Sequence, residues 1–255
     1  MDDLTSPRPA TVNASPAALP SGRGSTWWTE GWRLFVAAPG PWIAITVIFV
    51  VLMIMIALIP LLGTVANTLL TPVFAGGVLL GCRALDRGGE LTVGHLFASF
   101  SDRLGPLIIV GVLYLVGSFV IVALVVVCLI ATVGIGGFSA LLTGDPFEAG
   151  FAMLTTLGIG ALFSLLFGLL LGVPLLMAYW YAPALVVFRN DEPLAAMKTS
   201  FNACLVNMMP MLVYSLLGLV FAIVATIPLG LGWLVLAPVF VGSVYASYKD
   251  IFAEQ

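Results

Sequence analysis

Few side chains in this sequence are of the types that carry out chemistry, and they are scattered. The single histidine, His95, has no second ligand at helical spacing, so it does not predict a metal site. The three cysteines, Cys82, Cys128 and Cys204, are odd in number and unclustered, which indicates neither a disulfide framework nor a thiolate site. We therefore expect no catalytic residue, no metal and no cofactor, and a protein that is not an enzyme.

Carboxylates and histidines are also missing from the long apolar stretches of the chain. Intramembrane hydrolases and ion-coupled pumps need ionisable groups at depth in the bilayer, usually Asp, Glu, His or Arg. The stretches that could span a membrane carry bases only at their ends. This pattern argues against both classes of protein.

Uncharged polar side chains inside the apolar stretches are the candidates for lining a cavity. They are Asn67, Thr71, Tyr179, Tyr181, Tyr214 and Ser215. Such groups could line the path of a facilitator. The favoured alternative is hydrogen bonding between helices, at about 0.6–2 kcal/mol per pair.

Charged side chains gather in short clusters between the apolar stretches. Three of these clusters hold both signs: Arg83, Asp86, Arg87 and Glu90; then Arg189, Asp191, Glu192 and Lys198; and finally Lys249, Asp250 and Glu254. Membrane topology explains the bases, because Lys and Arg concentrate in cytoplasmic loops, but it does not explain the acids. Mixed-sign clusters at repeated positions are therefore candidate sites for binding a membrane-protein partner.

The composition indicates that membrane helices carry the polar and charged side chains named above. Of the 255 residues, 61% are apolar and 8% are charged, whereas a soluble domain carries roughly a quarter charged residues. A helical span needs about 20 apolar residues, and the continuous apolar runs favour helices over a β-barrel. The gaps between charges predict spans at about 42–62, 65–83, 105–131, 158–187, 208–228 and 233–249.

The distribution of charge gives an orientation for these six spans. All nine Lys and Arg residues fall on one side, while the other side carries only Asp145 and Glu148. Because basic residues favour the cytoplasm, both termini are expected to be cytoplasmic. The net charge of −3 and the lack of a basic stripe argue against nucleic acid, so the lipid bilayer is the expected partner.

One local pattern lies on the side of the membrane that carries few charges. Asp145, Pro146 and Glu148 have the spacing of a helix start, with a cap, a proline at the first position and an acid three residues after the cap. A helix over 146–188 would be about 64 Å long, twice the hydrocarbon thickness. We therefore expect a break near residues 158–160, with 146–157 lying along the membrane surface.

The chain contains an internal repeat. Pro72 and Pro238 open matching Pro-Val-Phe-x-Gly strings, and each lies eleven residues before a base, Arg83 or Lys249. The middle copy runs over 174–189 and is about one helical turn longer. Such self-similarity is the signature of a repeat architecture.

Amphipathic stretches precede three of the spans, and each ends at a phenylalanine: Phe35, Phe100 and Phe201. The first has the stripe Trp28, Trp32 and Phe35, and the second is expected as a helix over 91–100. Their helical periodicity is typical of helices in the membrane interface. We predict an all-α membrane protein with six transmembrane helices as three parallel two-helix repeats, each preceded by an interfacial amphipathic helix. The repeats cover about 25–88, 90–191 and 193–252 of a single domain, 25–252, which follows a disordered tail, 1–24.

Several strings resemble an uncharacterised family of bacterial inner-membrane proteins over roughly residues 25–250. They are Gly31-Trp32-Arg33-Leu34-Phe35, Ala38-Pro39-Gly40, Ile59-Pro60-Leu61-Leu62-Gly63, Arg83-Ala84-Leu85-Asp86 and Gly94-His95-Leu96-Phe97. In looser outline the chain is similar to the membrane domain attached to some bacterial glycerophosphodiester phosphodiesterases. Their catalytic domain has no counterpart here, so the resemblance implies an inner-membrane location and no activity.

These observations favour a multi-pass inner-membrane protein that serves as a non-enzymatic scaffold or accessory subunit. The alternative is a facilitator, or a protein that handles lipids or small molecules in a cavity between the repeats. A polar-lined interior would favour the alternative, and a solidly packed interior would favour the scaffold.

Overall fold

The computed structural model describes residues 16–60 and 62–252, and in these ranges it contains helices and turns and no strand. Residues 1–15, the first part of the expected tail, lie outside the described residues, as does Glu254. Two hydrogen bonds attach residues 16–22 to the helices of the body. Ala17 N donates to Ile251 O (2.9 Å), and Leu19 N donates to Asn207 Oδ1 (3.0 Å). The folded part therefore begins before the expected residue 25.

Six helical segments of the described chain are long and apolar enough to cross a membrane, the number that the sequence predicts. They are Pro39–Ala57, Leu62–Asp86, Leu104–Leu142, Pro146–Arg189, Met208–Thr226 and Trp233–Phe252. As helices they correspond to α2 (Pro39–Ala57), α3 (Leu62–Asp86), α5 (Leu104–Thr143), α6 (Pro146–Trp180) with α7 (Ala182–Arg189), α9 (Met208–Thr226) and α10 (Trp233–Phe252). The chain is an all-helical membrane protein.

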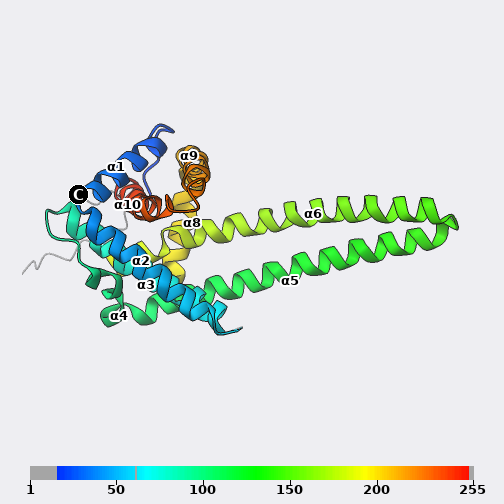
Figure 1. The fold of residues 1–255 in the computed structure, drawn as a ribbon, viewed down its shortest axis with the longest axis horizontal. Helices are drawn as coiled ribbons and strands as arrows, with labels where there is room; N and C mark the ends of the chain where they lie inside the picture. The colour runs from blue at the N-terminus through cyan, green and yellow to red at the C-terminus, as the bar shows by residue number, and fades with distance from the viewer. Residues whose placement is uncertain (1–15, 61, 253–255) are drawn as a thin grey trace, which may run out of the picture.

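The molecule has two unlike regions (Figure 1). The hairpin of α5 and α6 extends far beyond everything else in the molecule. The remaining helices, together with the base of the hairpin, form a body. The body also holds α1 (Arg23–Ala37), the 3-10 helix η1 (Val93–Phe97), α4 (Ser99–Asp102) and α8 (Pro193–Val206).

The expected break near residues 158–160 is wrong, because α6 runs without interruption from Pro146 to Trp180. The expected helix start is confirmed: Asp145 is the N-cap, and its carboxylate accepts from Phe147 N at 2.7 Å. A Cβ on Gly160 would lie 2.5 Å from Thr132 Oγ1 of α5. The glycine is therefore a point of close packing between two helices rather than a point where α6 breaks.

Four glycines let the two helices of the hairpin pack closely. Each of the four lies opposite a side chain of the other helix, in the pairs Gly117 with Leu175, Gly168 with Val125, Gly160 with Thr132 and Gly136 with Thr156. Small residues let membrane helices approach closely, which gains van der Waals contact where water provides no driving force. Two of the four lie on α5 and two on α6, so both helices contribute to the contact.

Short helical elements precede α2, α5 and α9, and each packs on a different part of the body. α1 lies on α10 and α9, η1 and α4 lie on α3, and α8 lies on α6 and α7. The second element is a 3-10 helix followed by a single turn, not the continuous amphipathic helix expected over 91–100. The expected apolar stripe of α1 is only partly buried, since Trp28 and Phe35 are buried while Trp32 is 52% exposed.

Candidate functional site

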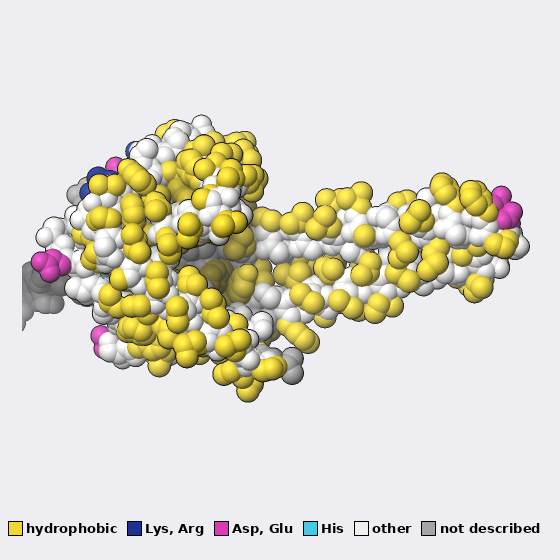
Figure 2. Space-filling model, viewed as in Figure 1, with side chains coloured by type: hydrophobic (Ala, Val, Ile, Leu, Met, Phe, Trp, Pro, Cys, Tyr) yellow, Lys and Arg dark blue, Asp and Glu magenta, His cyan; other side chains and the backbone are white. Residues whose placement is uncertain are grey.

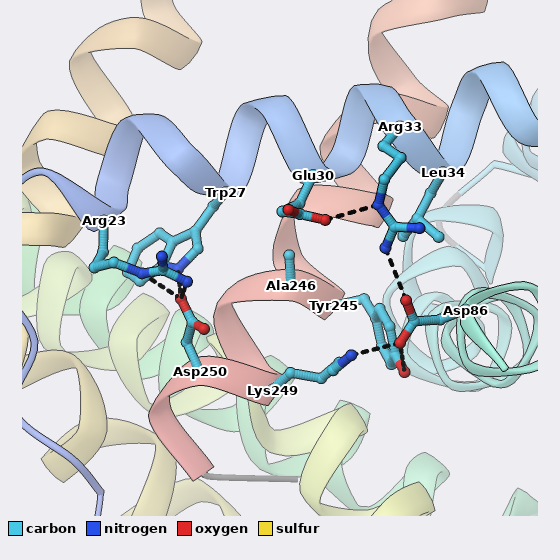
Figure 3. Close-up of a pocket in the computed structure, with 10 residues that line it drawn as sticks. All are labelled: Arg23, Trp27, Glu30, Arg33, Leu34, Asp86, Tyr245, Ala246, Lys249 and Asp250. Carbon is cyan, nitrogen blue, oxygen red and sulfur yellow. Dashed lines mark hydrogen bonds and ion pairs between the residues drawn. The ribbon is translucent and has the colours of Figure 1, made fainter. Parts of the chain in front are cut away.

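A cluster of ion pairs joins α1, the end of α3 and α10 around a small pocket of about 220 Å³ (Figure 3). The Asp86 carboxylate accepts from Arg33 Nη2 (2.8 Å), from Tyr245 Oη (3.3 Å) and from Lys249 Nζ. The next residue of α10 after Lys249, Asp250, accepts from Arg23 Nε (2.8 Å). We call Arg23, Arg33, Asp86, Lys249 and Asp250 the ion-pair clamp.

The groups of the clamp satisfy one another. Trp27 Nε1 donates to Asp250 (2.7 Å), and Arg33 Nε donates to Glu30 (2.8 Å). The hydrogen bond to Asp86, with that to Glu30, raises the pKa of Arg33 above its ordinary value, so this side chain stays charged. Since the acids of the pocket already have their donors, the arrangement suits a structural tie between the two ends of the chain rather than a catalytic site.

The bases at the repeated positions contact the next helix in a cyclic order. The guanidinium of Arg83 in α3 lies over the ring of Phe188 in α7, 4.6 Å from its centroid. That of Arg189 in α7 lies 5.7 Å from the Phe252 centroid in α10. Lys249 of α10 in turn contacts α3, because its Nζ donates a hydrogen bond to Asp86. Three helices that are distant in the sequence are thus linked at one end, which we call the charged end.

Aromatic rings of α7 and α10 pack against one another at the charged end. The centroid of Phe188 is 5.9 Å from that of Tyr245 and 5.1 Å from that of Tyr248, which lies 5.0 Å from Phe252. Tyr245, Tyr248 and Phe252 are all buried. We call these four residues the aromatic cluster, and it joins α7 to α10 at this end of the molecule.

In the body, α2, α3, η1, α6, α7 and α10 surround a central cavity of about 460 Å³. Figure 2 shows a hollow in this part of the molecule, at the foot of the hairpin. The lining is aliphatic and aromatic and includes Trp42, Phe74 and Trp180. Small-molecule sites typically have volumes of about 300–1,000 Å³ and apolar linings. The interior is therefore open but apolar, which is neither of the two outcomes weighed from the sequence.

The two threonine hydroxyls in this lining are engaged by their own helices. Thr46 Oγ1 donates to Trp42 O (2.9 Å), and Thr71 Oγ1 donates to Asn67 O (2.6 Å). The ring of Tyr179 lies 4.6 Å from that of Tyr114, centroid to centroid. The cavity therefore presents hydrocarbon and ring faces, and it suits an apolar ligand.

A second apolar cavity of about 380 Å³, the side cavity, lies between α9 and α10 beneath Trp28 of α1. Trp180, Trp233 and Phe240 line both cavities, and we call these three residues the wall. Trp28 Nε1 donates to Tyr214 O (3.1 Å), and its ring stacks on Tyr214 at 4.9 Å. α1 thereby covers the side cavity.

The six polar residues selected as cavity candidates are divided by the structure. Thr71 and Tyr179 line the central cavity, and Tyr214 and Ser215 line the side cavity. The other two are not in either lining. Asn67 Nδ2 donates to Met53 O (3.2 Å) and Tyr181 Oη donates to Ser247 Oγ (3.0 Å), both of them bonds between helices.

The residues of the three mixed-sign clusters are also divided. Arg83, Asp86 and Arg189 make the contacts at the charged end described above, and Lys249 and Asp250 belong to the ion-pair clamp. Asp191 forms an ion pair with Arg189 at 3.7 Å. Four residues are exposed: Arg87, Glu90, Glu192 and Lys198. His95 accepts from Thr92 N at 3.1 Å and so caps η1, which is a structural role.

Sequence reasoning missed α1 as part of the site, although a signal was present. Arg23, Trp27, Glu30 and Leu34 recur at helical spacing, which places them on one face of a helix, and all four line the clamp pocket. It also missed the wall. No pattern in the chain marks Trp180, Trp233 and Phe240 as neighbours.

Comparison with known proteins supports the membrane class and little beyond it. No protein-family model matches this chain, and no solved structure matches it. It is 27% identical over 223 residues to a probable inner membrane protein of Burkholderia thailandensis, covering 84% of this chain and 78% of that protein. This similarity adds nothing to the looser resemblance to the phosphodiesterase membrane domain. By its six apolar helices and by this relative, the chain is a membrane protein similar to a probable bacterial inner membrane protein.

Proposed function

We propose that this protein is a non-enzymatic protein of the bacterial inner membrane that holds a lipid between its membrane helices. The observation that carries the proposal is the central cavity, which is open, apolar and large enough for a ligand. Helices that span the membrane line this cavity, so the apolar molecules that surround it are lipid chains. The similarity to a probable inner membrane protein supports the location.

The proposed architecture is a bundle of three parallel two-helix repeats with the charged end in the cytoplasm. The residue before each repeat phenylalanine supports it, because Leu34, Ser99 and Ser200 make matching contacts. Leu34 and Ser99 approach glycines four residues after a repeat proline, Gly242 and Gly76. Ser200 Oγ donates to Met177 O (2.6 Å), three residues after the proline of the middle copy.

The order of these contacts also supports a threefold arrangement. Each short element packs on the inward-running helix of the preceding repeat: η1 and α4 on α3, α8 on α6 and α7, and α1 on α10. The cationic contacts at the charged end follow a cycle through the same three helices. Basic residues favour the cytoplasmic side, which agrees with placing this end there.

The apolar lining of the central cavity favours a lipid holder over a facilitator. A polar solute would need hydrogen-bonding groups along its path, whereas the free faces of this cavity are apolar. An apolar ligand would enter it from the bilayer, as a lipid chain does.

Filling the cavity tests the proposal. Ala75 lines the central cavity, while Ala123 lies on the exposed face of the hairpin, so Ala75→Phe and Ala123→Phe are a matched pair. Lipids that remain with protein purified in mild detergent would be extracted and quantified. We expect about one lipid per chain in the parent and in Ala123→Phe, and none in Ala75→Phe. Equal lipid content in folded samples of all three proteins contradicts the proposal.

A scaffold role is the second candidate, and the hairpin favours it. At 40 residues α5 is about 60 Å long, twice the roughly 30 Å of hydrocarbon in a bilayer. Large apolar side chains are exposed up to its tip, where Leu141 and Phe147 are each 83% exposed. Apolar surface beyond the hydrocarbon needs cover, which a partner protein would provide.

Photo-crosslinking from the hairpin tip tests the scaffold role. A crosslinking amino acid at Phe147 in living cells should give a protein adduct of defined mass, while the same group at Ile109, near the base, should give lipid adducts. Lipid adducts from both positions would argue against a partner on the hairpin.

A further inference from the structure

We infer that the bound lipid has two chains, one in the central cavity and one in the side cavity, on opposite sides of the wall. The inference rests on the proposed lipid-holding function and specifies its ligand. It names the ligand class by the number of its chains.

The sizes of the two cavities are the first observation. They measure about 460 and 380 Å³ and share the three residues Trp180, Trp233 and Phe240. A single-chain ligand would need only one of them. Two adjoining cavities of similar size on either side of one wall match a molecule that divides into two similar chains.

The chemistry of the linings is the second observation. No charged side chain of the described residues lines either cavity. In the side cavity Tyr214 Oη and Ser243 Oγ share a hydrogen bond (2.7 Å), so this hydroxyl is engaged. A charged headgroup would be desolvated there without compensation, which is costly. The headgroup must therefore lie outside both cavities, and only the chains and their junction lie within.

Lipid titrations of delipidated full-length protein, read by native mass spectrometry, test the number of chains. The probes are dioleoyl phosphatidylcholine, with two chains, and oleoyl lysophosphatidylcholine, with one. We expect the parent to bind the two-chain lipid at least about tenfold more tightly. Ala222 lines the side cavity, so Ala222→Phe should reduce the affinity for the two-chain lipid to that for the one-chain lipid. Binding of the one-chain lipid should be unchanged in this variant.

The outcomes separate this inference from the function on which it rests. If Ala222→Phe leaves the two-chain affinity unchanged while Ala75→Phe abolishes binding, the lipid-holding function stands and the two-chain assignment is overturned. If the parent binds one-chain and two-chain lipids equally, the assignment is likewise overturned. If the parent binds neither lipid, the proposed function itself fails. Ala123→Phe is the matched control and should bind like the parent.

Discussion

The body and the hairpin use the same apolar residues in different ways. In the body, 50% of an 18-residue apolar segment of α3 is buried inside the protein. In the hairpin, 0% of the corresponding segment of α5 is buried. Helices of the body meet neighbours on several sides, while α5 and α6 meet chiefly each other. Hydropathy predicts both regions as membrane helices, but only the body is built to enclose something.

The difference between the body and the hairpin is clearest where two helices cross closely. A Cβ on Gly31 of α1 would lie 2.3 Å from Val239 O of α10, a backbone atom that cannot move aside. A Cβ on Gly134 of the hairpin would meet nothing within 4 Å. The body depends on backbone contacts between distant segments of the chain, and the outer faces of the hairpin do not.

The largest effect is expected from Gly31→Ala. It should lower the free energy of unfolding by about 3 kcal/mol, the upper part of the range for overpacking, because α1 must move off α10. Gly134→Ala should instead raise it by about 0.5–1 kcal/mol, because alanine is the better helix former. Unfolding in mixed micelles, followed by circular dichroism, measures both. Equal effects of the two substitutions would contradict the distinction between the regions.

The next largest effect is expected at the ion-pair clamp. Asp86→Asn removes the charge shared by Arg33 and Lys249 and should cost about 2 kcal/mol, less than a fully buried pair because both bases are partly exposed. The exposed Glu90→Gln is the control and should change stability by less than about 0.5 kcal/mol. The same unfolding assay applies, and high salt should shrink the difference. A stability loss that is the same for both variants would show that the clamp does not tie the body together.

A smaller and local effect is expected within the hairpin. Gly160→Leu places a side chain against Thr132 and should cost about 1 kcal/mol. Amide hydrogen exchange should rise in the outer half of the hairpin and stay unchanged in the body, because the two regions share few contacts there. Faster exchange in α10 would mean that the regions are coupled after all.

The smallest effect is expected at the helix cap of the tip. Asp145→Ala removes the acceptor for Phe147 N and should cost about 0.5–1 kcal/mol. Amide exchange in the first turn of α6 should rise, with no change elsewhere. Asp145→Asn keeps an acceptor oxygen and should restore protection, so a failure of Asn to do so would show that the charge matters and the hydrogen bond does not.

The sequence predicts features set by neighbouring residues better than features set by long-range packing. Gaps between charges predict the six spans, and the spacing from Asp145 to Glu148 predicts the start of α6, because both signals are local. The supposed break near 158–160 failed because helix length was inferred from bilayer thickness. In the structure, packing of Gly160 on Thr132 keeps α6 continuous.

The site was less accessible to sequence reasoning, because its parts come together only through long-range packing. Arg33 and Lys249 belong to opposite ends of the chain and meet only through Asp86. Thr71 and Tyr179 could be selected as polar residues in apolar stretches, and both do line the central cavity. That the cavity would be apolar could not be predicted, because its tryptophans also suit a membrane belt.

A high-resolution map of the protein in lipid nanodiscs tests the lipid-holding function most directly. We expect a continuous, chain-shaped density inside the central cavity, in contact with Phe74 of α3 and Val241 of α10, and absent from Ala75→Phe. An interior closed by collapse of these helices onto each other, or a cavity holding only ordered water, would contradict it.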